Sequence, residues 1–168
     1  MTEQLVKFQS IKRFAQRPET ADITLKPLKL GVTTSKEVFL SCDGHIEPKM
    51  CYNNVFNVLT YNDTIYQTIV DGDIKIAYGF MTIPNTQVAV RHCFFVDQFD
   101  TVIDVTQAFL SDDMKESDYF VVKAFTDIDS YLEAISNENR EPALYRTLAK
   151  EFKQYEAKLN EAGYICLI

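Results

Sequence analysis

The sequence predicts an α+β fold in which an antiparallel sheet packs against a helix that begins near a cysteine, with further helices towards both ends of the chain. Strand-like segments follow one another at the centre of the chain, a helical pattern precedes them, and amphipathic patterns lie near both termini. With 168 residues, 46% of them hydrophobic, the chain can form one domain, which we expect to span residues 1–168.

Three strands are expected over residues 74–83, 87–96 and 101–106, where β-branched and aromatic residues gather between short turn segments. Strands joined by such short turns pair as an antiparallel meander. The middle segment is apolar on both faces, so we expect it at the centre of the sheet.

A helix is predicted over residues 48–61, immediately before these strands. Pro48 suits the first turn of a helix, and the apolar residues that follow fall on one face. Cys51 then lies near the N-terminal end. The asparagines of this segment are poor helix formers, so the helix must be held by packing.

The N-terminal part of the chain predicts one helix followed by loops. Residues 3–16 carry an apolar stripe at helical spacing, and Pro18 follows as a stop signal. Residues 21–40 are interrupted by proline and glycine, which favours loops with minor strands at 22–25 and 38–40.

The C-terminal part predicts alternating strands and helices. The expected elements are a strand over 119–125, a helix over 127–135 with its cap at Thr126 or Asp127, a helix over 141–162 and a last strand over 164–168. Pro142 fits the first turn of the long helix, and Gly163 fits its end.

Composition excludes several classes of function. A net charge of −7 and a pI near 4.8 argue against a nucleic-acid binder, which needs excess Lys and Arg. The sequence shows neither a signal-peptide pattern nor an apolar run long enough for a membrane span, so we expect a cytoplasmic protein. The cysteines form no CxxC pair, which favours reduced thiols; they are Cys42, Cys51, Cys93 and Cys166.

Cys51 is the candidate nucleophile, because the start of a helix favours a thiolate and offers backbone N–H groups to an oxyanion. A base is then needed, and the chain has only His45 and His92. His92 lies in the central strand, next to a strand that contains Asp104 among apolar residues. A carboxylate buried in an apolar strand needs a hydrogen-bonding or charged partner.

The His92–Asp104 contact depends on the register of one hairpin. If Phe95 pairs with Thr101, His92 faces Asp104 directly, with both side chains on one face. A shift by one residue places Val105 opposite His92, and a bulge is then needed for the pair to meet. The sequence does not decide between these two registers.

The order of these segments resembles the transglutaminase-like core of the papain-like cysteine hydrolases. The matching segments are Cys-Tyr-Asn-Asn-Val-Phe-Asn-Val-Leu (51–59), Ala-Tyr-Gly-Phe (77–80), Arg-His-Cys-Phe-Phe-Val-Asp (91–97) and Val-Ile-Asp-Val-Thr (102–106). The resemblance implies Cys51 as nucleophile, His92 as base and Asp104 as the acid that orients it. It also implies acyl transfer from a protein, peptide or small amide, as peptidase, amidase, glutamine deamidase or transglutaminase, without a cofactor.

Other interpretations stay open beside the triad. Cys51, His92 and Asp104 are each ordinary core or turn residues when taken singly. A zinc site would draw on Cys42, His45, Cys51, His92 and Cys93, but their spacing matches no closed site, so we expect no metal. The same fold also suits a non-enzymatic interaction protein with an acidic surface.

Overall fold

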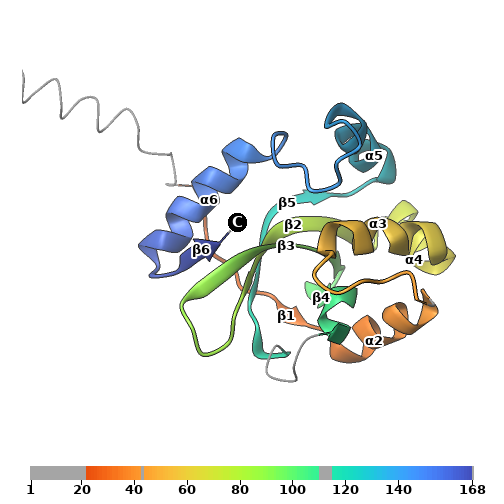
Figure 1. The fold of residues 1–168 in the computed structure, drawn as a ribbon, viewed down its shortest axis with the longest axis horizontal. Helices are drawn as coiled ribbons and strands as arrows, with labels where there is room; N and C mark the ends of the chain where they lie inside the picture. Colours follow the sequence, from red (N-terminus) through yellow and green to blue (C-terminus); the bar gives the residue numbers. More distant parts are fainter. Residues whose placement is uncertain (1–21, 43, 110–114, 168) are drawn as a thin grey trace, which may run out of the picture.

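The computed structural model describes residues 22–42, 44–109 and 115–167. Within these ranges the chain forms a six-stranded sheet and five α-helices, which confirms the α+β class (Figure 1). The helix predicted over residues 3–16 lies outside the described residues. No helix in the described part is long and apolar enough to cross a membrane.

The predicted meander forms the middle of the sheet. Strands β2 (Ile74–Thr82), β3 (Val88–Asp97) and β4 (Thr101–Ile103) pair antiparallel in sequence order, so β3 is central as expected. Strand β5 (Tyr119–Phe125) has the predicted bounds and pairs antiparallel with the other edge of β2. The strand predicted over 101–106 is shorter than expected, because the chain leaves the sheet after Ile103 for a 3-10 helix, η1 (Val105–Phe109).

The sheet is mixed, which corrects the prediction of an antiparallel one. Strand β1 (Lys29–Leu30) runs parallel to β4, and β6 (Ile165–Leu167) runs parallel to β3. Both strands are short and reach the sheet through long connections that include helices. Such connections allow parallel pairing, which a tight hairpin does not.

Helix α3 (Cys51–Tyr61) confirms the predicted helix and begins at Cys51. It cannot extend back to Pro48, because Lys49 has a left-handed backbone, with φ of 64°. Buried Val55 and Val58 hold its asparagine-rich sequence against the core. The next helix, α4 (Asp63–Val70), was not predicted.

Helix α2 (Val32–Ser41) replaces the loops and the strand expected around residues 38–40, so that prediction was wrong. Its first half is rich in β-branched residues, which favour strands when considered alone. Burial of Ser35 and Val38 against the rest of the molecule outweighs this preference. The helix packs beside η1 and β4, close to Asp104.

The C-terminal helices agree with the predictions except at one boundary. Helix α5 (Ile128–Asn137) is capped by Asp127, whose carboxylate accepts the Ser130 N–H at 2.7 Å. Helix α6 (Ala149–Glu161) begins later than residue 141, so Pro142 does not lie in its first turn. Gly163 follows α6 with φ of +96°, as a glycine stop signal requires.

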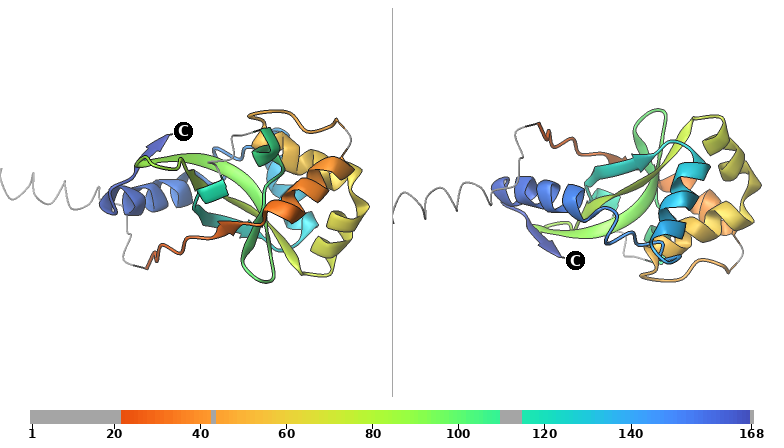
Figure 2. Two further views of the ribbon diagram at one scale, coloured as in Figure 1. Left: turned by 90° about the horizontal axis from the view of Figure 1, so that it is seen from below. Right: turned by 90° about the horizontal axis from the view of Figure 1, so that it is seen from above.

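The buried side chains form two clusters on opposite faces of the sheet. Along β2, Ile76, Tyr78 and Phe80 face the larger cluster under the helices, whereas Ala77 and Met81 face the smaller one. Figure 2 shows α6 at one end of the molecule and α2, α3 and α4 at the other. The N-terminal end of α3 points into the sheet near β3 and β4 (Figure 1).

Candidate active site

One edge of β3 has a gap, and the start of α3 lies against it. The edge of β3 away from β2 pairs with β6 at residues 88–90 and with β4 at residues 95–96. Between them, residues 91–94 have no strand beside them within the described part of the chain. Helix α3 contacts β3, and its first residue, Cys51, interacts with His92 from the gap.

Cys51 occupies the first position of α3 and exposes 7% of its surface. The first backbone hydrogen bond of the helix runs from the Asn54 N–H to the Met50 carbonyl, at 2.7 Å. The N–H groups of residues 51–53 therefore precede the helical ladder. The thiol and these donors are at the positive end of the helix dipole.

His92 links Cys51 to Asp104. Its Nε2 lies 2.6 Å from the Oδ2 of Asp104, and the Cys51 thiol is close enough to help raise the pKa of the ring. Because Asp104 occupies Nε2, Nδ1 is the nitrogen left for the thiol. The structure thus brings together all three residues that the sequence singled out.

The surroundings of His92 favour its charged form. Burial opposes the charge, but the Asp104 carboxylate, its hydrogen bond and the Cys51 thiol outweigh this penalty and raise the pKa of His92 to about 10. At neutral pH the ring is therefore an imidazolium. It lies within a largely buried pair, since His92 exposes 6% and Asp104 1% of its surface.

Asp104 is held by three hydrogen bonds to its carboxylate. Its Oδ2 accepts the Tyr119 hydroxyl at 2.9 Å as well as His92, and its Oδ1 accepts the Thr106 N–H at 3.0 Å. Its own N–H donates to the Ser35 hydroxyl at 3.1 Å. Sequence reasoning missed Tyr119 and Ser35, which come from distant segments without a recognisable motif.

The hairpin register differs from both registers considered from sequence. Phe95 pairs with Ile103 and Val96 with Val102, so neither Thr101 opposite Phe95 nor a one-residue shift from it occurs. In a continued ladder, Asp104 would not oppose His92. It reaches the ring because the strand has ended: the Thr106 N–H bond to its carboxylate turns the chain at this point.

Asp97 sets this register by fixing the hairpin loop. Its Oδ1 accepts the N–H groups of Phe99 and Thr101 at 2.8 and 2.9 Å. Asp100 takes the left-handed conformation, with φ of 60°. The loop thereby closes over residues 98–100. It is shorter than the loop that either register considered from sequence would require.

Asn54 connects the element that carries Cys51 with the one that carries Asp104. Its side chain is fully buried and exchanges two hydrogen bonds with the backbone of Glu47, at 2.7 and 2.9 Å. Its Nδ2 also donates to the Thr106 hydroxyl at 2.9 Å. An asparagine in an unfavourable helical context was the one signal in the sequence for this role.

The other cysteines lie in surroundings that disfavour the thiolate. Burial raises the pKa of Cys42. Burial, with the nearby Cys51 and Asp104, raises the pKa of Cys93 well above its usual value. Burial and the Glu156 carboxylate raise the pKa of Cys166 to about 11.

The arrangement of the His, Cys, Asp and Glu side chains gives no support to the zinc interpretation. No group of three or more His, Cys, Asp or Glu side chains in the described ranges could hold a metal ion. His45 is exposed and stacks on Tyr61, with ring centroids 3.6 Å apart.

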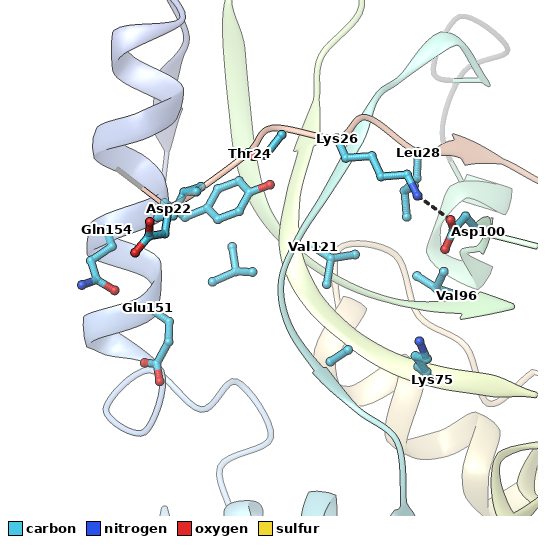
Figure 3. A pocket seen from close by; sticks show the side chains of 14 residues that line it. Asp22, Thr24, Lys26, Leu28, Lys75, Val96, Asp100, Val121, Glu151 and Gln154 are labelled. Atoms are coloured by element: carbon cyan, nitrogen blue, oxygen red, sulfur yellow. Dashed lines mark hydrogen bonds and ion pairs between the residues drawn. The ribbon is translucent and has the colours of Figure 1, made fainter. Parts of the chain in front are cut away.

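Two of the cavities among the described residues bear on the site. One, of about 400 Å³, adjoins the first turns of α3; it is lined by Glu47, Met50, Asn53, Asn54, Phe56, Asn57, Ile135, Arg140 and Pro142. The other, of about 470 Å³, lies between residues 22–28, the sheet and α6, with the Lys26–Asp100 ion pair at 2.5 Å on its wall (Figure 3). None of the three candidate residues lines either cavity, but the first contains their neighbours Met50 and Asn54.

Comparisons with family models, with curated proteins and with solved structures found no match to the chain.

Proposed function

We propose that the chain is a cysteine-dependent acyl-transfer enzyme with a core of the transglutaminase-like kind. Cys51 is the nucleophile, His92 the base and acid, and Asp104 the residue that fixes the ring of His92. One observation carries the proposal: His92 hydrogen-bonds through Nε2 to a buried carboxylate, and its pKa is also raised by a neighbouring thiol at the start of a helix. Acyl transfer needs this combination of groups.

In the first step, the Cys51 thiolate attacks the carbonyl carbon of a peptide or carboxamide, and the carbonyl electrons move onto oxygen. The free N–H groups at the start of α3 supply donors for this oxyanion. The C–N bond then breaks, and the His92 imidazolium gives its proton to the departing amine. A thioester on Cys51 remains.

In the second step, a water molecule or an amine attacks the thioester. His92, now neutral, takes a proton from this nucleophile, and the C–S bond breaks to restore the Cys51 thiolate. Asp104 stays ionised throughout and keeps Nε2 of the ring occupied, so Nδ1 remains the nitrogen that exchanges the proton.

The cavity beside α3 offers room for the acyl part of a substrate. Met50 and Asn54, on its wall, flank Cys51 in sequence and in the first turn of the helix. Apolar side chains, asparagine amides and one charge of each sign, from Glu47 and Arg140, together line it, a mixture that suits a polypeptide segment.

A non-enzymatic interaction protein is the second candidate, and the burial of the site favours it. Cys51 and His92 expose 7% and 6% of their surfaces, and Asp104 is fully hydrogen-bonded. In that case Cys51, His92 and Asp104 form a structural cluster beside the unpaired edge of β3. The two candidates differ in whether Cys51 forms a covalent acyl intermediate.

Turnover of a peptide panel separates them. The chain is incubated with glutamine-containing peptides, with and without an added primary amine, and peptides and protein are followed by mass spectrometry. We expect a product of hydrolysis, deamidation or amine exchange, and a transient acyl adduct on the tryptic peptide that contains Cys51.

Cys51→Ser and Cys42→Ser form a matched pair of controls for this experiment. The first is expected to abolish product and adduct, and the second to leave both unchanged. Product that survives in Cys51→Ser, or an absence of any adduct on Cys51 in the wild type, would contradict the proposal.

A further inference from the structure

Arg91 carries a positive charge that has no counter-ion in the described part of the chain. It directly precedes His92 on β3, with its side chain on the opposite face. It takes part in none of the ion pairs found among the described residues. Its Nε is buried, and no described group accepts a hydrogen bond from it.

Two aromatic rings lie against the guanidinium, and none of the hydrogen bonds found among the described residues comes from its N–H groups. The central carbon lies 4.3 Å from the centroid of the Phe152 ring and 5.9 Å from that of Tyr145. Such cation–π contacts restrict the position of the group. A planar fork of N–H donors held in this way is arranged for a carboxylate, which it binds through two parallel hydrogen bonds.

Aromatic contacts link this charge to the residue that follows the proposed nucleophile. Tyr52, the residue after Cys51, packs against Tyr145 with ring centroids 5.9 Å apart. Burial, followed by Cys51, Cys93 and Tyr145, raises the pKa of the Tyr52 hydroxyl, and Arg91 lowers it. One hydroxyl thus interacts with both Cys51 and Arg91.

We infer that Arg91 recognises a carboxylate on the substrate of Cys51. The substrate class is then an amide or peptide that bears a carboxylate within a few bonds of the carbonyl under attack. This inference rests on the proposed function and specifies its substrate. Arg91 is a specificity residue and takes no part in the covalent chemistry.

Two probes that differ only in charge test the inference on the full chain. N-iodoacetylglycine carries a carboxylate, and N-iodoacetylglycinamide has a neutral amide in its place. Each alkylates a thiolate with loss of iodide, and mass spectrometry gives the rate at Cys51. We expect the charged probe to react on the order of tenfold faster, as a charge-assisted pair provides.

Arg91→Met is expected to remove this preference while leaving the rate of the neutral probe unchanged, since Met retains much of the packing against Phe152. Arg91→Lys should keep a reduced preference, because Lys presents a point charge instead of a planar fork. Lys153→Met removes an exposed positive charge next to Phe152 in the chain and should change nothing. His92 attracts the charged probe equally in all variants.

An equal preference in wild type and Arg91→Met, or its loss in Lys153→Met alone, overturns the inference and leaves the proposed function intact. If Cys51 reacts with the neutral probe no faster than an ordinary thiol, the proposed function fails and the inference fails with it. Should Arg91→Met not fold, wild type and Arg91→Lys decide: the preference must fall with added salt and be smaller in the variant.

Discussion

At the scale of single residues, the site depends on the charge that Asp104 induces on His92. The ring is buried, yet its pKa is raised to about 10 by the Asp104 carboxylate, its hydrogen bond and the Cys51 thiol. An imidazolium beside a thiol is the arrangement that favours a thiolate. Removing the charge of Asp104 should therefore change, first of all, the pKa of His92.

We expect Asp104→Asn to lower the pKa of His92 below its wild-type value of about 10, because burial then opposes the imidazolium without compensation. NMR titration of the ring resonances measures this pKa, with exposed His45 as the internal reference. A His92 resonance that titrates at the same pH in wild type and variant would refute the role given to Asp104.

The same pair makes stability depend on pH. The pKa of His92 is about 10 in the folded chain and about 6.5 in an unfolded one. Because the folded value is higher, the stabilisation is complete below about pH 6.5 and is lost as the pH rises through about 10. Urea unfolding should show this decline in wild type and a weaker one in Asp104→Asn, once the common titration of other groups is subtracted.

Sequence reasoning identified Cys51, His92 and Asp104 but not how they meet. Cys51 could be located because a helical pattern starts beside it. The contact between His92 and Asp104 was expected from one of two ladder registers, and neither occurs. A hairpin loop fixed by Asp97 and a turn fixed by Asp104 itself decide the geometry, and side-chain bonds of this kind leave no periodic signal.

At the scale of elements, Asn54 connects α3 to the turn after β4. Asn54→Ala would leave the backbone groups of Glu47 without their partners, at a cost of about 1–3 kcal/mol in the free energy of unfolding. It would also free the Thr106 turn from α3. We expect slower alkylation of Cys51 as well as lower stability.

Asn53→Ala is the matched control, because Asn53 is the exposed neighbour on the same helix. Urea unfolding and the rate of iodoacetamide alkylation at Cys51 measure the two effects. Equal behaviour of the two alanine variants would show that the Asn54 bonds do not position Cys51.

Gly79 lies opposite His92 on β2, at the bulge where β5 comes close. A Cβ at this position would lie 1.8 Å from the Phe120 carbonyl oxygen, so one strand must move. We expect Gly79→Ala to lower the free energy of unfolding by about 3 kcal/mol or more. Lys75→Ala, exposed on the same strand, should have a small effect in the same urea titration.

Helices and strands could be predicted where the local sequence pattern and the tertiary packing favour the same structure. The long apolar runs of β2, β3 and β5 predicted strands close to their observed bounds. In α2 the two disagree, since a β-branched segment is made helical by burial of Val38 and by its place beside η1. A single sequence does not reveal such a tertiary contact.

At the scale of the whole molecule, the site lies where the sheet is incomplete. Strands β4 and β6 cover β3 on either side of residues 91–94, and the start of α3 fills the interval. The mixed sheet is thus part of the site. The mixed pairing could not be predicted from sequence, because two- and three-residue strands such as β1 and β6 have too few residues to show a strand pattern.

Glu138 holds the long connection between α5 and α6 in place over α3. Its carboxylate accepts the N–H groups of Arg146 and Thr147 at 2.5 and 2.7 Å, and the Tyr78 hydroxyl donates to the Pro142 carbonyl of the same segment at 2.6 Å. Burial acts against the charge of Glu138, but these hydrogen bonds prevail and lower its pKa.

Because its folded pKa is lowered, Glu138 stabilises the chain above the unfolded value of about 4.3, and this contribution is lost as the pH falls through the folded pKa. Glu138→Gln should therefore lose about 1–3 kcal/mol at neutral pH and unfold with a weaker dependence on acid. Glu141→Gln, exposed in the same connection, is the control in urea titrations at neutral and acid pH. Equal losses in both variants would contradict this role.

Cys51, His92 and Asp104 are proposed to act as one unit, and alkylation of the cysteines by iodoacetamide at neutral pH tests this proposal. Mass spectrometry compares the modification rate of Cys51 with those of Cys42, Cys93 and Cys166. We predict selective modification of Cys51 in wild type, a slower rate in Asp104→Asn, and loss of the selectivity in His92→Ala. Absent or equal labelling at Cys51 in wild type, or selectivity that survives in His92→Ala, would contradict the account.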